Sequence, residues 1–262
     1  MFDTLTTDTS IQSDGDNLGG SRYGTLDSAI YPFDIKLAYG SISNGGAKAL
    51  NLVLETEDGK ELKAQLWLTS ATAKGGQNFY MAKDPKTGQK TIKKYLPGFE
   101  LADHLCLMTL GKHISQVKSE TKTIMLYDFT QRKEVPTEVP MVTELLGKKI
   151  FAAIIKQTVN KRVKDQAGNY VDSTETRDEN EIDKFFHYPS GLTVTEAEAK
   201  MTEPVFKGQW AEKWTGQVKD KTSKTAVNVI AGPGNSGTFG NTGNTTPEQV
   251  SAGASLFGGA AA

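Results

Sequence analysis

The sequence predicts a mainly β protein, and three features of the residue pattern support this class. Several runs alternate apolar and polar residues with a period of two, which is typical of strands with one buried face. Short segments containing Gly or Asp separate these runs, as turns do between paired strands. The clearest helical spacing of apolar residues is confined to residues 101–110. The chain has 262 residues, which suffice for one large domain or two small ones.

The first half of the chain predicts three strands, a long loop and a helix. Residues 28–40 form the first predicted strand. Two alternating runs around residues 57–60 predict a hairpin, because the Asp-Gly pair in its centre favours a tight turn. The lysine-rich residues 71–97 predict a loop. The helix that follows is expected to stop at Gly111.

The second half predicts further strands and two short helices. The extended runs cover residues 123–130 and 149–164, and residues 166–169 have the composition of a turn. Shorter predicted segments are strands at 170–174 and 183–188, and helices or turns at 193–200 and 209–214.

Three strands, a helix and two more long strands follow each other in the order of an OB-type barrel. We therefore expect an OB-like five-stranded barrel with a helix between strands 3 and 4, extra hairpins and a flexible C-terminal tail. Such barrels bind oligonucleotides on one face and in the connecting loops. An elaborated sandwich or another small barrel is the alternative.

The two ends of the chain differ in composition from its middle. Residues 1–28 are rich in Thr, Ser and Asp and predict an acidic flexible arm, which leaves residues 29–230 as the OB-like domain. Residues 231–262 are rich in Gly, Ser and Asn and predict a disordered tail, because they contain too little apolar surface to offset the entropy of ordering. Leu256 and Phe257 form a small apolar tip, which is a candidate partner-binding element.

The composition narrows the function classes. The single cysteine, Cys106, excludes an internal disulfide framework and suits a reducing compartment; its apolar helical surroundings predict a core thiol. No apolar run has the length of a membrane span, and the N-terminus lacks the apolar region of a signal peptide. We expect a cytoplasmic protein without membrane association. The three histidines are scattered, so we expect no metal, no cofactor and no catalytic residues.

The formal net charge of −1 hides a strong segregation of charge along the chain. Residues 60–94 contain eight lysines and two acids, and residues 148–164 contain five lysines, one arginine and no acid. Residues 172–183 carry six acids and one arginine, and the first 20 residues carry four aspartates. Such segregation predicts a surface with an oriented electrostatic field.

Aromatic residues lie among the lysines of the first basic segment, which is typical of a surface that binds single strands. Lysines neutralise phosphates, and a stacked base contributes ~1–3 kcal/mol whatever its identity. The candidate stacking residues are Trp67, Phe79, Tyr80 and Tyr95. The candidate phosphate-binding residues are Lys63, Lys74, Lys83, Lys86, Lys90, Lys93 and Lys94, with Lys148, Lys149, Lys161 and Arg162 as a second group.

Other interpretations of the same residues remain open. The lysines of residues 71–97 can serve solubility, while the rings turn inward to pack. Met125, Tyr127 and Phe129 alternate in one run and are expected in the core. The acidic residues 172–183, which we expect in a hydrophilic loop, can hold a divalent metal for a nuclease. A β-barrel structural or virion protein is the third possibility.

Four segments together give the chain a family resemblance. These are "SAIYPFDIKLAY", "LETEDGKEL", "KKYLPGFELADHLCLMTLGK" and "LLGKKIFAAIIKQTVN". Over roughly residues 25–190 the chain resembles single-stranded DNA-binding proteins of tailed bacteriophages, most closely those of phages whose virion carries an RNA polymerase. The resemblance implies an OB-type fold, cooperative coating of single-stranded DNA, and a role in phage DNA replication and recombination in the host cytoplasm. In some relatives it also implies transcription activation through host RNA polymerase. The tail departs from the acidic tails of many such proteins, because its one charged residue is Glu248.

Overall fold

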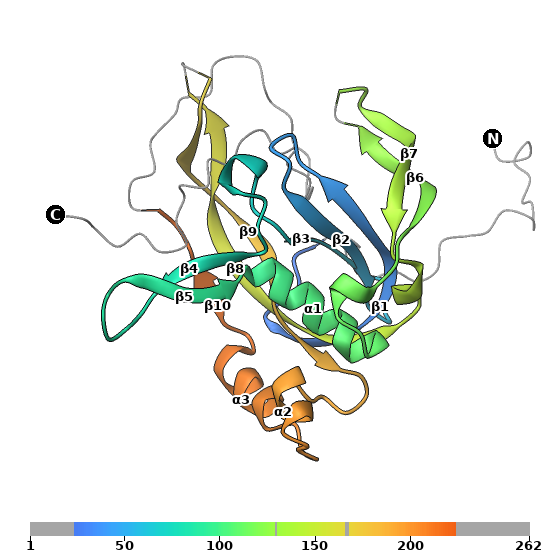
Figure 1. Ribbon diagram of the computed structural model, residues 1–262. Helices are drawn as coiled ribbons and strands as arrows, with labels where there is room; N and C mark the ends of the chain where they lie inside the picture. Colours follow the sequence, from blue (N-terminus) through green and yellow to red (C-terminus); the bar gives the residue numbers. More distant parts are fainter. Residues whose placement is uncertain (1–23, 129, 166–167, 224–262) are drawn as a thin grey trace, which may run out of the picture.

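The computed structural model of the chain describes residues 24–128, 130–165 and 168–223 (Figure 1). The described residues form a mainly β structure with one large, mostly antiparallel sheet, which confirms the prediction of a mainly β protein. The central strands are β1 (Ala29–Ile42), β2 (Lys48–Glu55), β3 (Glu61–Trp67), β8 (Lys149–Lys164) and β9 (Tyr170–His187). They lie side by side in the order β9-β8-β1-β2-β3.

The remaining elements are two hairpins, three helices and short connecting pieces. The hairpins are β4 (Phe79–Lys83) with β5 (Lys90–Tyr95), and β6 (Glu120–Asp128) with β7 (Lys133–Met141). The helices are α1 (Pro97–Leu110), α2 (Val194–Glu198) and α3 (Val205–Trp214), followed by the short strand β10 (Val218–Asp220). Single 3-10 turns occupy Thr72–Lys74, Ile114–Gln116 and Thr143–Leu145. Within the described part of the chain, no helix has both the length and the apolar character needed to cross a membrane.

Strand β1 connects the two halves of the sheet. Its first part, from Ala29 to Asp34, pairs with β8, and the part that begins at Asp34 pairs with β2. A register shift between Ile35 and Leu37 marks the change, as expected where a strand bends. Among the described strands no ladder joins β3 to β9, and α1 contacts both of them instead.

The main core lies between this sheet and α1. Alternate residues of β2 point inward, and Leu52 and Leu54 are among the fully buried side chains that meet Leu105 of α1. The opposite face of β8 and β9 is covered by α3, where Trp210 packs on Phe186. The Trp210 indole donates a hydrogen bond of 2.7 Å to a carboxylate of β9, so the largest buried ring on this face also has its polar atom satisfied.

The predicted helix and its end are confirmed. Gly111 has a φ of 66°, and its N–H bonds to the carbonyl of Leu107, which is the left-handed termination that glycine allows. Cys106 is 1% exposed, and burial raises the pKa of its thiol to about 12. The prediction of an unreactive core thiol agrees with this environment.

The hairpin β4–β5 replaces most of the loop predicted for residues 71–97. Its two strands form a separate two-stranded sheet, with Phe79 opposite Tyr95 and Met81 opposite Lys93. Figure 1 shows this hairpin projecting away from the main sheet. The prediction of an irregular loop was therefore wrong, although the segment does protrude into solvent.

The acidic residues 172–183 lie in strand β9, so the prediction of a hydrophilic loop was wrong. The strand runs without interruption through both short strands predicted at 170–174 and 183–188. It pairs with β8 along nearly its whole length, with Asp172 opposite Arg162, Asp178 opposite Thr158 and Glu179 opposite Gln157. Basic and polar cross-strand partners of this kind overcome the low strand propensity of Asp and Glu.

The exposed residues Met125 and Tyr127 correct a further prediction. They were expected in the core, but their side chains are 56% and 47% exposed. Both lie on the outer face of the β6–β7 hairpin. Phe129, expected to pack with them, lies outside the described residues.

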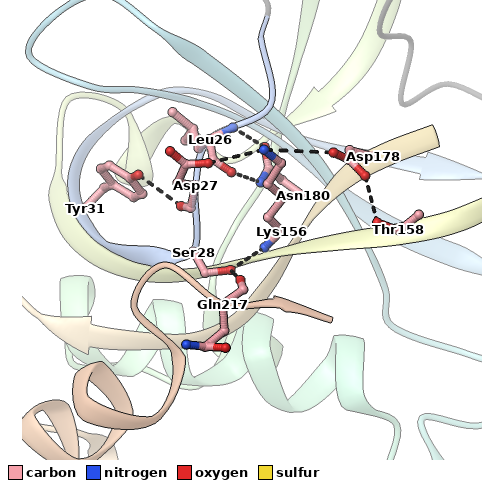
Figure 2. Close-up of polar contacts among 9 residues, drawn as sticks. All are labelled: Leu26, Asp27, Ser28, Tyr31, Lys156, Thr158, Asp178, Asn180 and Gln217. Carbon is pink, nitrogen blue, oxygen red and sulfur yellow. Dashed lines mark hydrogen bonds and ion pairs between the residues drawn. The ribbon is translucent and has the colours of Figure 1, made fainter. Parts of the chain in front are cut away.

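Residues 24–28 belong to the folded structure, although the sequence assigns them to the acidic arm (Figure 2). The side chain of Asn180 accepts a hydrogen bond from the N–H of Leu26 and donates one to its carbonyl, both at 2.7 Å. The Ser28 hydroxyl donates to the Gln217 carbonyl and accepts from the N–H of Lys156. These bonds hold the chain entering β1 against β8, β9 and the segment before β10.

We expect Asn180→Ala to lower the free energy of unfolding by about 1–3 kcal/mol, because two partly buried backbone groups of Leu26 lose their partner. Urea unfolding followed by circular dichroism measures this. The control Gln209→Ala removes an exposed side chain of α3 and should change stability by less than about 0.5 kcal/mol. Equal stability of the two variants would mean that the Leu26 contacts do not hold the segment.

Candidate nucleic-acid interface

The hairpin β4–β5 gathers the largest group of predicted binding residues. It contains five lysines and one acid, Asp84, whose carboxylate accepts a hydrogen bond from the backbone of Lys86. The side chains of Tyr80 and Tyr95 are 37% and 57% exposed. All five lysines are exposed, and they are Lys83, Lys86, Lys90, Lys93 and Lys94.

None of these five ammonium groups forms an ion pair with a described residue, in contrast to bases such as Lys36, Lys112, Lys161 and Arg177. One of the five contacts an aromatic ring: Lys93 Nζ lies 4.9 Å from the centre of the Phe79 ring. A cation over an exposed ring gains only about 0.5–1 kcal/mol. The charge of the hairpin therefore remains available to an anionic ligand.

Rings occupy both faces of the hairpin at its base. Phe79 and Tyr95 are directly opposite each other and share one face, while Tyr80 lies on the other face opposite Lys94. Tyr95 also contacts Phe99 of α1, with 4.8 Å between ring centres. Phe79 is half-buried, so Tyr80 and Tyr95 are the predicted rings of this hairpin with the most surface open to a base.

The base of the hairpin is fixed to the end of β3. The N–H of Leu96 bonds to the carbonyl of Asn78, which closes the hairpin at 2.9 Å. One residue into α1, Gly98 packs so closely on β3 that a Cβ atom there would lie 2.5 Å from the carbonyl oxygen of Trp67. Glycine allows this approach because it has no side chain. The strand that carries Lys63 and Trp67 is thus tied to the hairpin that carries the free lysines.

On β3, the predicted residues Lys63 and Trp67 lie on the outer face of the sheet, as alternation requires. Lys63 is exposed and Trp67 half-buried. Between them lies Gln65, whose amide donates a 2.9 Å hydrogen bond to Asn51 of β2. Asn51 in turn donates to the hydroxyl of Ser41 at 2.8 Å. The outer face therefore offers a positive charge, an indole and a row of fixed amides.

Sequence reasoning missed this row of amides. Asn51 is 8% exposed, although it is polar and lies between two buried leucines. Its neighbour Tyr39 is half-buried, and burial raises the pKa of its phenol, which stays protonated at neutral pH. The signal available was Asn51 itself, a single amide in the otherwise apolar run "ALNLVL".

The structure divides the second predicted group between the two ends of β8. Lys148 and Lys149 lie at its start, and Lys161 and Arg162 lie twelve or more positions later, which is about 40 Å along an extended strand. Lys161 Nζ is 3.0 Å from Glu175, and Arg162 Nε is 3.8 Å from Asp172. The four residues do not form one surface, and the two at the far end are paired with acids of β9.

Acids of β9 neutralise other bases in the same way. Glu181 lies within 3.4 Å of both Lys219 in β10 and Lys221 just after it, and Glu179 pairs with Arg177 of the same strand at 3.2 Å. Across the described ranges, no group of three or more His, Cys, Asp or Glu side chains has the arrangement of a metal site. The acidic residues of β9 therefore serve to pair with bases of the sheet.

The remaining predicted residues are placed as follows. Lys74 is exposed in the 3-10 turn Thr72–Lys74, which follows β3. Leu256 and Phe257, the predicted partner-binding tip, lie outside the described residues.

No family model matches this chain, and a search of curated proteins found no match. A functional conclusion therefore depends on the chemistry of the surface formed by β3 and the β4–β5 hairpin.

Proposed function

We propose that this chain is a non-enzymatic single-stranded DNA-binding protein that coats DNA largely independently of sequence. The observation that carries the proposal is the β4–β5 hairpin, which exposes the rings of Tyr80 and Tyr95 at its base and five lysines along its length, none of them paired with an acid among the described residues. Lysines that are not neutralised by the protein can replace counterions along a sugar-phosphate backbone. Exposed aromatic rings stack on any base, because every base has a π-face, so such a site has little sequence preference.

The order of the strands supports the same function. In an OB-type fold, a long first strand pairs with both the second and the fourth, and a helix fills the space between the third and the fifth. Here β1 pairs with β2 and β8, and α1 contacts β3 and β9. The OB-type assignment makes β2 and β3 the binding face, which is the face that carries Lys63, Gln65 and Trp67.

The proposed path of the strand crosses this face and continues onto the hairpin. Trp67, Tyr80 and Tyr95 stack on bases, and Lys63 and the hairpin lysines neutralise phosphates. Replication and recombination of phage DNA are the processes that need such coating, and activation of host RNA polymerase is the further role implied by the resemblance. The ends of β8 are secondary contacts in this proposal, since acids already compensate Lys149, Lys161 and Arg162.

Fluorescence anisotropy of labelled oligo-dT tests the proposal. If five phosphates are neutralised, affinity should fall about three thousandfold between about 50 mM and about 500 mM salt, because the slope for single strands is about −0.7 per contact. Oligo-dC should bind with an affinity within about tenfold of oligo-dT, since stacking tolerates every base.

Two results would contradict the proposal. No binding at about 50 mM salt would favour a structural or virion protein whose lysines serve solubility. Loss of the labelled strand on incubation with Mg²⁺ or Mn²⁺ would favour a nuclease. Bound, intact DNA with a steep salt dependence is the expected result.

A further inference from the structure

The outer face of the β6–β7 hairpin is a second exposed surface with a distinct chemistry. Register places Thr123 opposite Glu138, Met125 opposite Pro136, and Tyr127 opposite Glu134 on this face. All six side chains are exposed, whereas the inner face carries the half-buried Ile124, Leu126 and Val135 and the buried Val139. A sheet face that exposes Met and Tyr side chains over several positions is typical of an interaction surface.

The charge on this face is acidic and uncompensated. Glu134 and Glu138 form no hydrogen bond or ion pair with any described residue. The strand positions of this face carry no base, because Lys122 and Lys133 lie on the inner face, and Lys122 pairs with Glu120 there at 3.0 Å. The outer face therefore attracts a cationic surface with apolar side chains between its charges.

Two prolines reduce the backbone donors of β7. Pro136 and Pro140 lie within this strand, and neither has an N–H. Proline is one of the residues that keep another strand from adding to an edge. Along β7, a partner therefore meets the side chains of the outer face rather than a full row of backbone donors.

The β4–β5 hairpin has the complementary properties. Its five lysines have no acidic partner in the described structure, and Tyr80, Met81 and Tyr95 are exposed between them. We propose that the β4–β5 hairpin of one copy docks on the outer face of the β6–β7 hairpin of a second copy. Ammonium groups then face Glu134 and Glu138, and exposed rings and methionines pack between them.

The contact can form only between copies. Figure 1 shows the two hairpins projecting from opposite sides of the molecule. Each copy therefore offers a basic hairpin at one side and an acidic face at the other. Such a head-to-tail contact is heterologous, and it produces open chains of molecules unless a rotation closes them into a ring.

This inference rests on the proposed function in one respect. The hairpin lysines are those that we propose to hold phosphates, so a DNA strand and the acidic face of a neighbour compete for them. Self-association is then strongest for the free protein. Single-stranded DNA releases the copies from one another as it binds.

Sedimentation velocity of the full chain without DNA tests the contact. At about 50 mM salt the average mass should rise with protein concentration, and at about 500 mM salt it should return to that of the monomer, because the charges are exposed and screened. Excess oligo-dT at low salt should have the same effect as high salt. A monomer at every concentration at low salt would overturn the inference.

Charge exchange identifies the surfaces. Glu134→Lys/Glu138→Lys should weaken self-association at least about tenfold, and so should Lys93→Glu/Lys94→Glu, because each variant brings like charges together. An equal mixture of the two variants should associate again, since each then offers a surface that complements the other. The control Glu198→Lys/Glu212→Lys changes two exposed helical acids and should associate like the original chain.

The outcomes separate this inference from the proposed function. Association that is unchanged in both variants, or a mixture that remains monomeric, would overturn the hairpin contact. Neither result depends on DNA, so the salt-dependent oligo-dT titration would still stand. Conversely, failure of that titration would leave the measured association intact and limit it to a contact between copies.

Discussion

Removing four positive charges from the β4–β5 hairpin is expected to weaken binding to oligo-dT by at least tenfold at about 50 mM salt. The variant is Lys83→Gln/Lys90→Gln/Lys93→Gln/Lys94→Gln. Each of these ammonium groups lacks an acidic partner among the described residues, so each can replace a counterion on a phosphate. If all four do so, the slope of log affinity against log salt becomes shallower by about 3, because each contact contributes about 0.7.

A matched control removes four positive charges that the protein already neutralises. It is Lys36→Gln/Lys112→Gln/Lys122→Gln/Arg177→Gln, in which every replaced base pairs with a glutamate at 2.6–3.2 Å. The net charge of the two variants is identical. Equal losses of affinity would mean that long-range charge, and not the hairpin, attracts the strand.

The two variants should differ little in their free energy of unfolding. The hairpin lysines are exposed, and the cation–π contact of Lys93 with Phe79 is an exposed one of modest strength. Exposed substitutions of this kind usually change stability by less than about 0.5 kcal/mol each. Thermal unfolding of both variants therefore checks that a change in affinity reports the surface and not the fold.

The sequence predicted correctly those elements that are determined by residues close together along the chain. The bounds of β8 agree with the predicted run 149–164, because a run that is apolar on both sides in its middle and basic at its ends is typical of a buried strand whose ends reach solvent. The β2–β3 hairpin follows from Asp58 and Gly59, and the latter adopts a φ of 76°. The end of α1 follows from Gly111 in the same way.

The elements that the sequence did not predict depend on partners far along the chain. Residues 172–183 form a strand because β8 lies beside them, with Thr158 opposite Asp178 and Arg162 opposite Asp172. Their own composition favours solvent, so propensity alone predicts a loop. Strands β4 and β5 are short and rich in lysine, and they pair with each other with little apolar alternation to mark them.

The candidate site was predicted in part for the same reason. Local clustering of lysines and rings indicated the hairpin and β3. Sequence reasoning could not show that Lys161 and Arg162 are paired while the hairpin lysines have no acidic partner among the described residues, because the acids that pair with Lys161 and Arg162 lie on another strand. The pairing of the strands decides which charged residues neutralise each other and which stay exposed, and this pairing cannot be read from the order of the charges along the chain.

Gly98→Ala is expected to lower the free energy of unfolding by about 1–3 kcal/mol, and the sign of this effect is the test. Helix propensity alone predicts the opposite, since alanine within a helix is favoured over glycine by roughly 0.5–1 kcal/mol. However, a Cβ atom at Gly98 would lie 2.5 Å from the carbonyl oxygen and 2.6 Å from the nitrogen of Trp67. Backbone atoms cannot rotate away, so α1 and β3 must separate, and overpacking of this kind costs about that much.

Gly208→Ala provides the matched control, because Gly208 lies within α3 and an added Cβ would meet no atom within 4 Å. This variant should be as stable as the original chain or more stable. Urea unfolding compares both variants. A Gly98→Ala chain that is equally stable or more stable would contradict the close packing of α1 on Trp67.

The same substitution connects the fold to the proposed site. The contact at Gly98 sets where the β4–β5 hairpin begins relative to Trp67, since two residues separate Gly98 from Tyr95. If the indole and the hairpin lysines hold one DNA strand, separating α1 from β3 misplaces them relative to each other. Gly98→Ala should then weaken oligo-dT binding several-fold at temperatures where the variant remains folded, with little change in the salt slope, because every lysine is still present. Unchanged affinity would mean that Trp67 and the hairpin bind independently, and the proposed continuous path from β3 to the hairpin would be wrong.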